Sequence, residues 1–216
     1  MAKLRVVSAV GMMAVLLAVG ACAPDAAGPL KMDEAQLETW EIHLVEGRIE
    51  KNEAFMDPST SPLPAEDIPG FEGLNYYFPD PALVFRAPLV AVSSADTVRL
   101  RKRRGEDVSY LVKGSVSLEI AGEAVELLVY GPVSTEHGDY LWLPFYDLTN
   151  QGETYSGGRY LDLKAPVDGI VGVDFNAAYN PLCDYDPDTY NCTLPPDTNR
   201  IPLAIEVGEK LFRPHS

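Results

Sequence analysis

The sequence predicts a mainly β fold, either an antiparallel β-sandwich or a partly open barrel, with one N-terminal amphipathic helix. Two patterns lead to this class. In residues 33–56, apolar side chains recur every three or four positions, which is typical of a helix. After residue 83, the chain passes through short segments rich in β-branched and apolar residues, and turn residues such as Gly105 and Gly122 separate them.

The start of the chain is typical of a lipoprotein signal. Lys3 and Arg5 precede an apolar run over residues 6–18, and small residues lead into Cys22. A transmembrane helix needs about 20 apolar residues, which is longer than this run. An ordinary secretory signal does not require cysteine at the first mature position. We therefore expect Cys22 to carry acyl chains such as palmitate.

This interpretation divides the chain into a signal peptide (1–21), a flexible tether (22–32) and a single β-rich domain (33–216). The protein is then exported and anchored by lipid in the cell envelope. Ala23 stands where aspartate would retain a lipoprotein in the inner membrane of a Gram-negative cell. In such a cell we expect the periplasmic face of the outer membrane.

The charge of the chain limits its partners. The formal net charge is −15, and loss of Lys3 and Arg5 with the signal makes it about −17. We do not expect nucleic acid as a partner, because binding it depends on neutralising phosphates with Lys and Arg. A broad basic contact with anionic head groups is excluded for the same reason, so the membrane contact must come through the N-terminal lipid.

The helix has clear boundaries. Asp33 and Gln36 resemble a capping box, and Asp57-Pro58 ends the segment. A single apolar stripe is normally directed at the core, so we expect the helix to cover one face of a sheet. The residues assigned to that stripe are Leu37, Trp40, Leu44, Val45, Ile49 and Met56.

The strands follow in order along the rest of the chain. Three consecutive hairpins are predicted between residues 97 and 130, which makes that part of the sheet antiparallel. Pro144 places its segment at an edge or a bulge. The expected strands are 83–92, 97–103, 108–113, 115–120, 124–130, 140–148, 153–163, 170–174 and 201–206.

Polar residues at strand ends and in loops of the segment 147–200 form the candidate site, since binding residues favour such positions. Asp147 and Asp174 are the candidate acid and base, as glycoside hydrolysis would require. Arg159, beside two glycines, can offer its donors to a carboxylate or phosphate. Two alternatives stay open: Arg159 forms a structural ion pair with Asp147 or Asp174, and each aspartate caps a turn. The candidate ligand-binding residues are Asn150, Arg159, Asn176, Asn180, Asn199 and Arg200.

Cys183 and Cys192 enclose eight residues. In an exported protein, two cysteines at this spacing predict a disulfide rather than reactive thiols. We expect no metal site. The loop between them begins like a calcium loop, but Thr189 stands where that loop needs glycine and Pro195 where it needs glutamate.

Several runs resemble the bacterial domain of unknown function family 1684, over about residues 35–212. The resemblance implies one domain and implies no reaction or substrate; we expect no cofactor. One departure is the longer, more acidic run between the cysteines. The similar runs are 145–150, 153–161, 174–183, 192–196, Asn199-Arg200, 61–63, 71–74 and 77–79, with Arg48, Lys51 and Asn52 in the helix.

Three functions remain open at this stage. The first is an envelope module that binds a small polar or anionic ligand through the Asp/Asn/Arg cluster. The second is a hydrolase in which Asp147 and Asp174 share one cleft beside Arg159. The third is a structural or assembly partner whose polar cluster only organises the fold.

Overall fold

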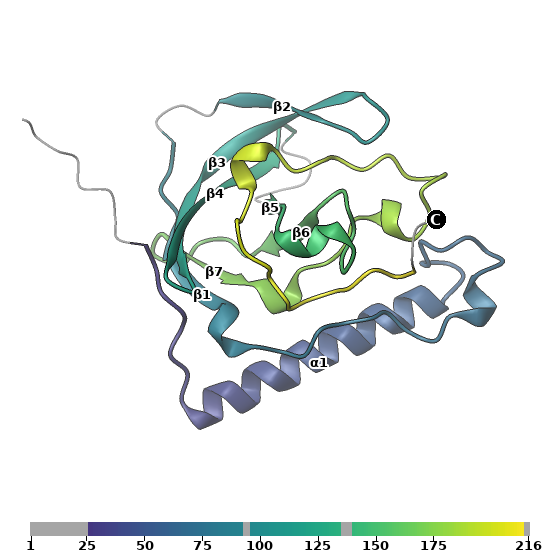
Figure 1. Cartoon of the computed structure of the whole chain (residues 1–216), viewed down its shortest axis with the longest axis horizontal. Coiled ribbons are helices and arrows are strands. Elements are labelled where there is room, and N and C mark those ends of the chain that lie inside the picture. Colours follow the sequence, from purple (N-terminus) through teal and green to yellow (C-terminus); the bar gives the residue numbers. More distant parts are fainter. Residues whose placement is uncertain (1–25, 93–95, 135–139, 214–216) are drawn as a thin grey trace, which may run out of the picture.

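The prediction of a mainly β fold is confirmed. The structure, a computed structural model, describes residues 26–92, 96–134 and 140–213. They form a five-stranded and a two-stranded antiparallel sheet, and the long helix α1 lies along one side (Figure 1). The expected signal and Cys22 lie outside the described residues, so lipid anchoring stays a prediction. No helix in the described part of the chain is long and apolar enough to cross a membrane.

Helix α1 (Glu34–Met56) begins and ends where the sequence predicts. The side chain of Asp33 accepts a hydrogen bond from Gln36 N, and the Gln36 side chain accepts one from Asp33 N, which completes the capping box. The apolar residues, however, occupy two opposite sides of the helix. Trp40 and Leu44 line a cavity on the inner side and Phe55 is buried. Val45, Ile49 and Met56 were expected on the same stripe, but about half of each is exposed.

The five-stranded sheet runs in the order β2-β3-β4-β5-β6. Its strands are β2 (Thr97–Arg101), β3 (Asp107–Ile120), β4 (Glu123–Pro132), β5 (Leu141–Phe145) and β6 (Arg159–Leu163). One of the three predicted hairpins is wrong, because residues 108–113 and 115–120 are a single strand with a register shift at Val112/Gly114. A Cβ at Gly114 would lie 2.6 Å from the Val90 carbonyl oxygen, so glycine is needed for this close contact and not for a turn.

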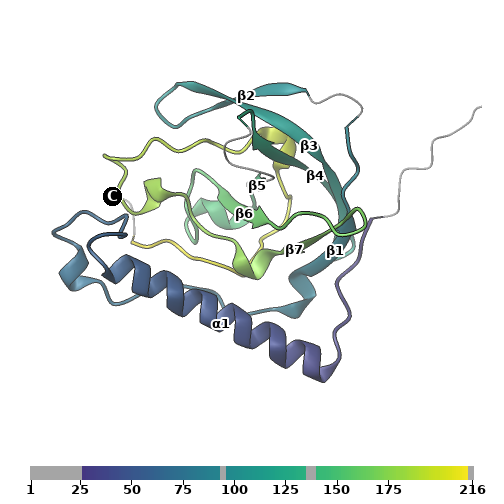
Figure 2. The same ribbon diagram turned by 180° about the vertical axis from the view of Figure 1, so that it is seen from behind.

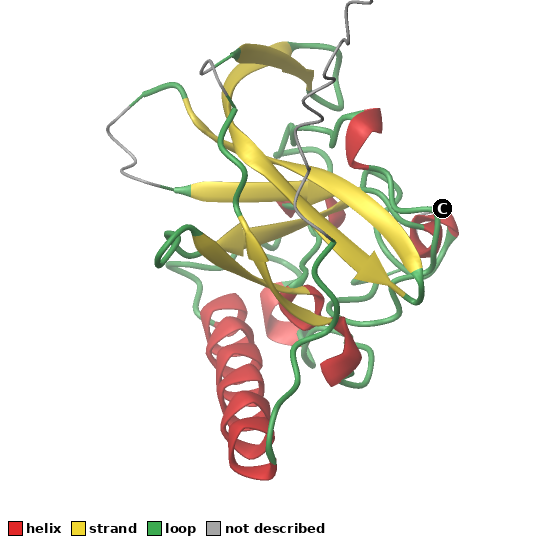
Figure 3. Ribbon diagram, turned by 90° about the vertical axis from the view of Figure 1, so that its left-hand side faces the viewer, coloured by secondary structure: helices red, strands yellow, loops and turns green. Residues whose placement is uncertain are grey.

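The two-stranded sheet pairs β1 (Val84–Pro88) with β7 (Ile170–Asp174). Figures 2 and 3 show it between α1 and the larger sheet. Its inward residues, such as Phe85 and Val173, join the main core with residues of β3 to β6. The segment predicted as a strand over residues 201–206 forms no regular strand, and next to it a bridge joins Arg200 to Tyr146.

The segment before α1 is attached to both sheets. Strand β3 is much longer than β2, so part of its edge is left for other segments to pair with. Ala27 donates to Ser117 O and accepts from Glu119 N, and Leu30 N donates to Val84 O in β1. The flexible tether expected over residues 22–32 is therefore too long, since the chain is held on the sheets from Ala27 onward.

Candidate functional site

Arg159 and Asp147 form an ion pair inside the fold. The guanidinium of Arg159 is completely buried, and its Nη2 lies 2.8 Å from Asp147 Oδ2. It also donates to the carbonyl oxygens of Ile205 and Val207. Asp147 in turn caps the following 3-10 turn by accepting from Thr149 N. The pair thus joins β6, the chain after β5 and the C-terminal segment. This confirms the alternative in which Arg159 forms a structural ion pair with Asp147.

Three of the predicted asparagines, Asn150, Asn180 and Asn199, also bind the protein's own backbone. Asn199 exchanges hydrogen bonds with Leu128 N and O and donates to Pro144 O, so its amide bridges β4 and β5 where these strands share only one register pair. Asn180 donates to Asp184 and to Lys210 O. Asn150 accepts from Asp147 N and donates to Tyr155 O. Their buried polar groups are therefore satisfied within the fold.

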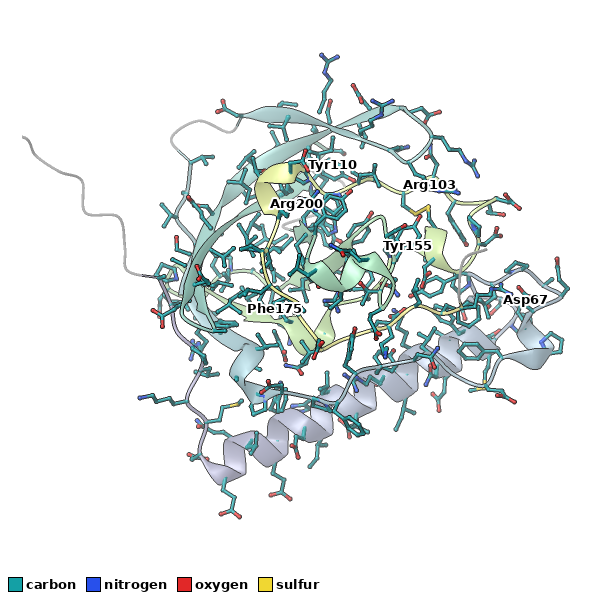
Figure 4. The ribbon with its side chains drawn as sticks, viewed as in Figure 1. Asp67, Arg103, Tyr110, Tyr155, Phe175 and Arg200 are labelled. Atoms are coloured by element: carbon teal, nitrogen blue, oxygen red, sulfur yellow. A yellow bond between two sulfur atoms is a disulfide. The ribbon has the colours of Figure 1, made fainter. Side chains whose placement is uncertain are left out.

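Arg200 is separate from both groups. Its exposed guanidinium pairs with Asp197 at 2.8 Å and lies over the ring of Tyr146. Figure 4 shows it on the side of the molecule away from α1. The Cys183–Cys192 disulfide is present, as predicted, with a Cα–Cα distance of 6.0 Å.

The candidate site itself is a cavity of about 620 Å³ between α1 and the outer face of the two-stranded sheet. Two predicted site residues, Asp174 and Asn176, line it. Asp147 and Arg159 do not, so the two candidate carboxylates share no cleft in the described structure. The apolar part of the lining is Leu30, Trp40, Leu44, Val84, Phe85, Leu161, Leu163, Val173, Ala178 and Tyr179.

At one end of the cavity, Asp174 fixes α1 to β7. The indole Nε1 of Trp40 donates to Asp174 Oδ2 at 2.7 Å, and the backbone N and the side chain of Asn176 both donate to Oδ1 at 2.9 Å. Asn176 also exchanges two hydrogen bonds with the backbone of Asp80. Both oxygens of this carboxylate therefore have donors.

Lys51 and Glu209 form a second group in the lining. The ammonium of Lys51 lies 2.6 Å from Glu209 Oε2, and Tyr185 donates its hydroxyl to Oε1. Glu209 is fully buried whereas Lys51 is partly exposed. Burial raises the pKa of Glu209 above its ordinary value of 4.5, and the charge of Lys51 opposes that rise.

Arg48 and Tyr76, like Lys51 and Glu209, are lining residues that were not among the predicted site residues. The Arg48 guanidinium lies 4.3 Å from the centre of the Tyr76 ring. Its Nη atoms donate only long hydrogen bonds, 3.3 Å to Tyr77 O and 3.4 Å to Asn176 O. Its Nε and the Tyr76 hydroxyl are buried and have no hydrogen-bond partner among the described residues. Burial lowers the pKa of Arg48, and the negative charges of Asp174 and Glu209 oppose that fall only in part.

A pattern in the helix could have identified this end of the cavity. Arg48 and Lys51 stand on the same side of α1 as Trp40, Leu44 and Phe55, where an apolar stripe would normally exclude cations. The sequence marked both cations only as part of the family resemblance. Among the described residues, no group of three or more His, Cys, Asp or Glu is placed to hold a metal ion.

Comparison with known proteins agrees with the fold. A family model described as "Protein of unknown function (DUF1684)" matches residues 69–210. The solution NMR structure of the uncharacterized protein from gene locus rrnAC0354 of Haloarcula marismortui is 35% identical, with a TM-score of 0.64, and the likeness covers 83% of this chain and 97% of that one. The part of this chain covered by the likeness is longer than the segment 69–210 matched by the family model, so the likeness extends into the residues before 69, where α1 lies. No curated protein matches the chain.

Proposed function

The chain belongs to the DUF1684 family, and from this premise we propose that it is a small-molecule-binding domain whose ligand occupies the cavity beneath α1. The observation that carries the proposal is the cavity itself. Its volume of about 620 Å³ lies in the range typical of ligand pockets, roughly 300–1,000 Å³. Its lining combines apolar walls with a few polar groups, which is the usual composition of such sites.

The position of the cavity supports the same proposal. Its floor is the outer face of β1 and β7, where Arg86 lies opposite Gly172 in the strand register. Helix α1 covers the cavity from the other side as its roof. Its Trp40 and Lys51 contact Asp174 and Glu209 through polar groups, and not through a continuous row of apolar side chains. The space between these two contacts can hold an apolar ligand body.

A neutral fluorescent probe, N-phenyl-1-naphthylamine, tests the proposal. We expect the chain from residue 22 onward, carrying Cys22→Ser, to bind one probe molecule and to unfold at a higher temperature in its presence. Gly47→Phe and Gly172→Phe add a ring from the roof and from the floor, where a Cβ meets no atom within 4 Å. Both should abolish binding.

Val45→Phe is the matched control, because it adds a ring on the exposed side of the same helix. It should leave probe binding unchanged. If Gly47→Phe and Gly172→Phe bind the probe as well as Val45→Phe and the parent protein do, the cavity is not the binding site and the proposal fails.

We also propose that the domain works in the cell envelope, anchored through Cys22. Because the chain is held on β3 from Ala27 onward, Cys22 can lie at most roughly 17 Å from that point, at about 3.4 Å per residue. Membrane fractionation and mass spectrometry of the N-terminal peptide test the anchor. Acylated Cys22 is the expected result, and an unmodified or uncleaved N-terminus would refute it.

A further inference from the structure

The Arg48 end of the cavity offers donors with no acceptor. An arginine can only donate hydrogen bonds, so the buried Nε of Arg48 can be satisfied only by an acceptor. Burial raises the pKa of the Tyr76 hydroxyl, which keeps it protonated and able to donate as well. A ligand group that satisfies both must present acceptor atoms.

The charges that line the cavity point in the same direction. Four lining residues are cationic, namely Arg48, Lys51, Arg86 and Lys164, and three are anionic, namely Asp162, Asp174 and Glu209. One positive charge is therefore left over, although the whole chain is strongly acidic. A ligand with a single negative charge would balance this lining.

The lining carboxylates are already engaged. Asp174 accepts from Trp40 and Asn176, Glu209 is paired with Lys51, and Asp162 accepts from the hydroxyls of Tyr140 and Tyr179. Among the described residues, Arg48, Arg86 and Lys164 have no carboxylate within 4 Å. Arg86 and Lys164 are exposed to solvent, whereas Arg48 is half-buried, so Arg48 is the unpaired lining cation that gains most from a ligand.

A cationic ligand fits this end poorly. Two aromatic rings of the lining already carry the protein's own cations, since Arg48 lies over Tyr76 and the Lys51 ammonium lies 5.0 Å from the centre of the Tyr179 ring. The apolar walls formed by Leu30, Leu44 and Val84 continue from the polar end and match an uncharged body.

We infer that the ligand is an amphiphilic monocarboxylate, with its carboxylate at the Arg48 guanidinium beside Tyr76 and its apolar body along the walls of the cavity. This assignment rests on the proposed function, because it names the chemical class of the ligand for the same cavity. A carboxylate supplies two acceptor oxygens and one negative charge, and bonds from arginine to carboxylate are among the stronger hydrogen bonds in proteins.

Displacement of N-phenyl-1-naphthylamine by octanoate, 1-octanol and octylammonium tests the inference, because these compounds differ only in their head group. We expect octanoate to bind at least tenfold more tightly than octanol, and octylammonium to bind most weakly. Arg48→Met should remove the preference for octanoate over octanol while octanol still binds. Tyr76→Phe, which keeps the ring under Arg48, should reduce the preference in part.

Arg99→Met is the control, since Arg99 lies in β2, is exposed and does not line the cavity. It should leave the preference intact. Equal binding of octanoate and octanol, a preference for octylammonium, or an unchanged preference in Arg48→Met and Tyr76→Phe would overturn the inference and leave the proposed function standing. If neither the neutral probe nor any of the three compounds binds, the proposed function itself fails.

Discussion

Two arginines with a buried Nε, Arg159 and Arg48, have different roles in this fold. Both Arg159 and Arg48 have an Nε with no hydrogen-bond partner among the described residues. Arg159 also has a carboxylate at 2.8 Å and two backbone carbonyls, and it is fully enclosed. Arg48 has two long hydrogen bonds and faces a cavity. Burial alone therefore does not identify a functional arginine; the remaining partners and the adjacent space do.

The largest expected effect concerns the Arg159–Asp147 pair. Arg159→Met leaves Asp147 buried without its cation and should lower the free energy of unfolding by about 3–5 kcal/mol. Urea denaturation measures the loss. The exposed pair of Arg200 and Asp197 is the control, and Arg200→Met should cost less than about 1 kcal/mol. If the two variants lose the same free energy of unfolding, the buried Arg159–Asp147 pair contributes no more to stability than the exposed pair does.

The disulfide should stabilise the fold without contributing to the cavity. Cys183 and Cys192 are nine residues apart, and closing a loop of this length restricts the unfolded chain by about 2–3 kcal/mol. Cys183→Ser with Cys192→Ser should lower the free energy of unfolding by that amount. Binding of the neutral probe should stay unchanged at a temperature where the variant is folded; a lost or weakened site would contradict this separation.

Glu209, in the lining of the cavity, should make the free energy of unfolding depend on pH. Its pKa is raised in the folded state, so its contribution to stability is present below pH 4.5 and is lost as pH rises through the folded-state value. The stability of the parent protein relative to Glu209→Gln should therefore fall as pH rises above about 4.5. Unfolding curves of both proteins from pH 4 to 8 measure this difference. If the relative stability of the parent protein instead rises with pH, burial does not raise the pKa of Glu209.

Lys51→Met sharpens the same test. Without the ammonium, the buried carboxylate loses its compensating charge, so the variant should lose about 1–3 kcal/mol at neutral pH. The loss should shrink in acid, where Glu209 is protonated. A loss that does not change with pH would mean that Lys51 acts through packing alone.

The smallest expected effect on stability is at Arg48. Its hydrogen bonds are long and it has no carboxylate partner in the described part of the chain, so Arg48→Met should change the free energy of unfolding by less than about 1 kcal/mol. Urea denaturation beside Arg159→Met measures the contrast. If Arg48→Met is as destabilising as Arg159→Met, then Arg48 is a structural residue like Arg159.

Local patterns in the sequence predicted much of the fold. The capping box at Asp33 and the proline after Asp57 marked the helix, because both act within one turn. The sequence predicted separate strands before and after Gly114, since glycine permits both a turn and a bulge and only the contact with Val90 decides between them. The attachment of Ala27 to β3 depends on an edge more than 80 residues away in the chain, which no local pattern encodes.

The candidate site was harder to predict for the same reason. Asp147 and Arg159 have the residue types of a site, and only the return of Ile205 and Val207 makes them part of the interior. Arg48 left a weaker signal, a cation on the inner side of a helix, and the space beside it depends on how α1 lies over β7. Sequence alone could name polar clusters but could not tell which of them has a cavity beside it.

Side-chain NMR of the arginine Nε–H groups during a titration with octanoate shows which of the two arginines meets the ligand. We expect the Arg48 Nε–H resonance to shift in proportion to octanoate binding and the Arg159 resonance to stay in place. A shift confined to Arg159, or saturated binding of octanoate with no change at Arg48, would contradict this expectation.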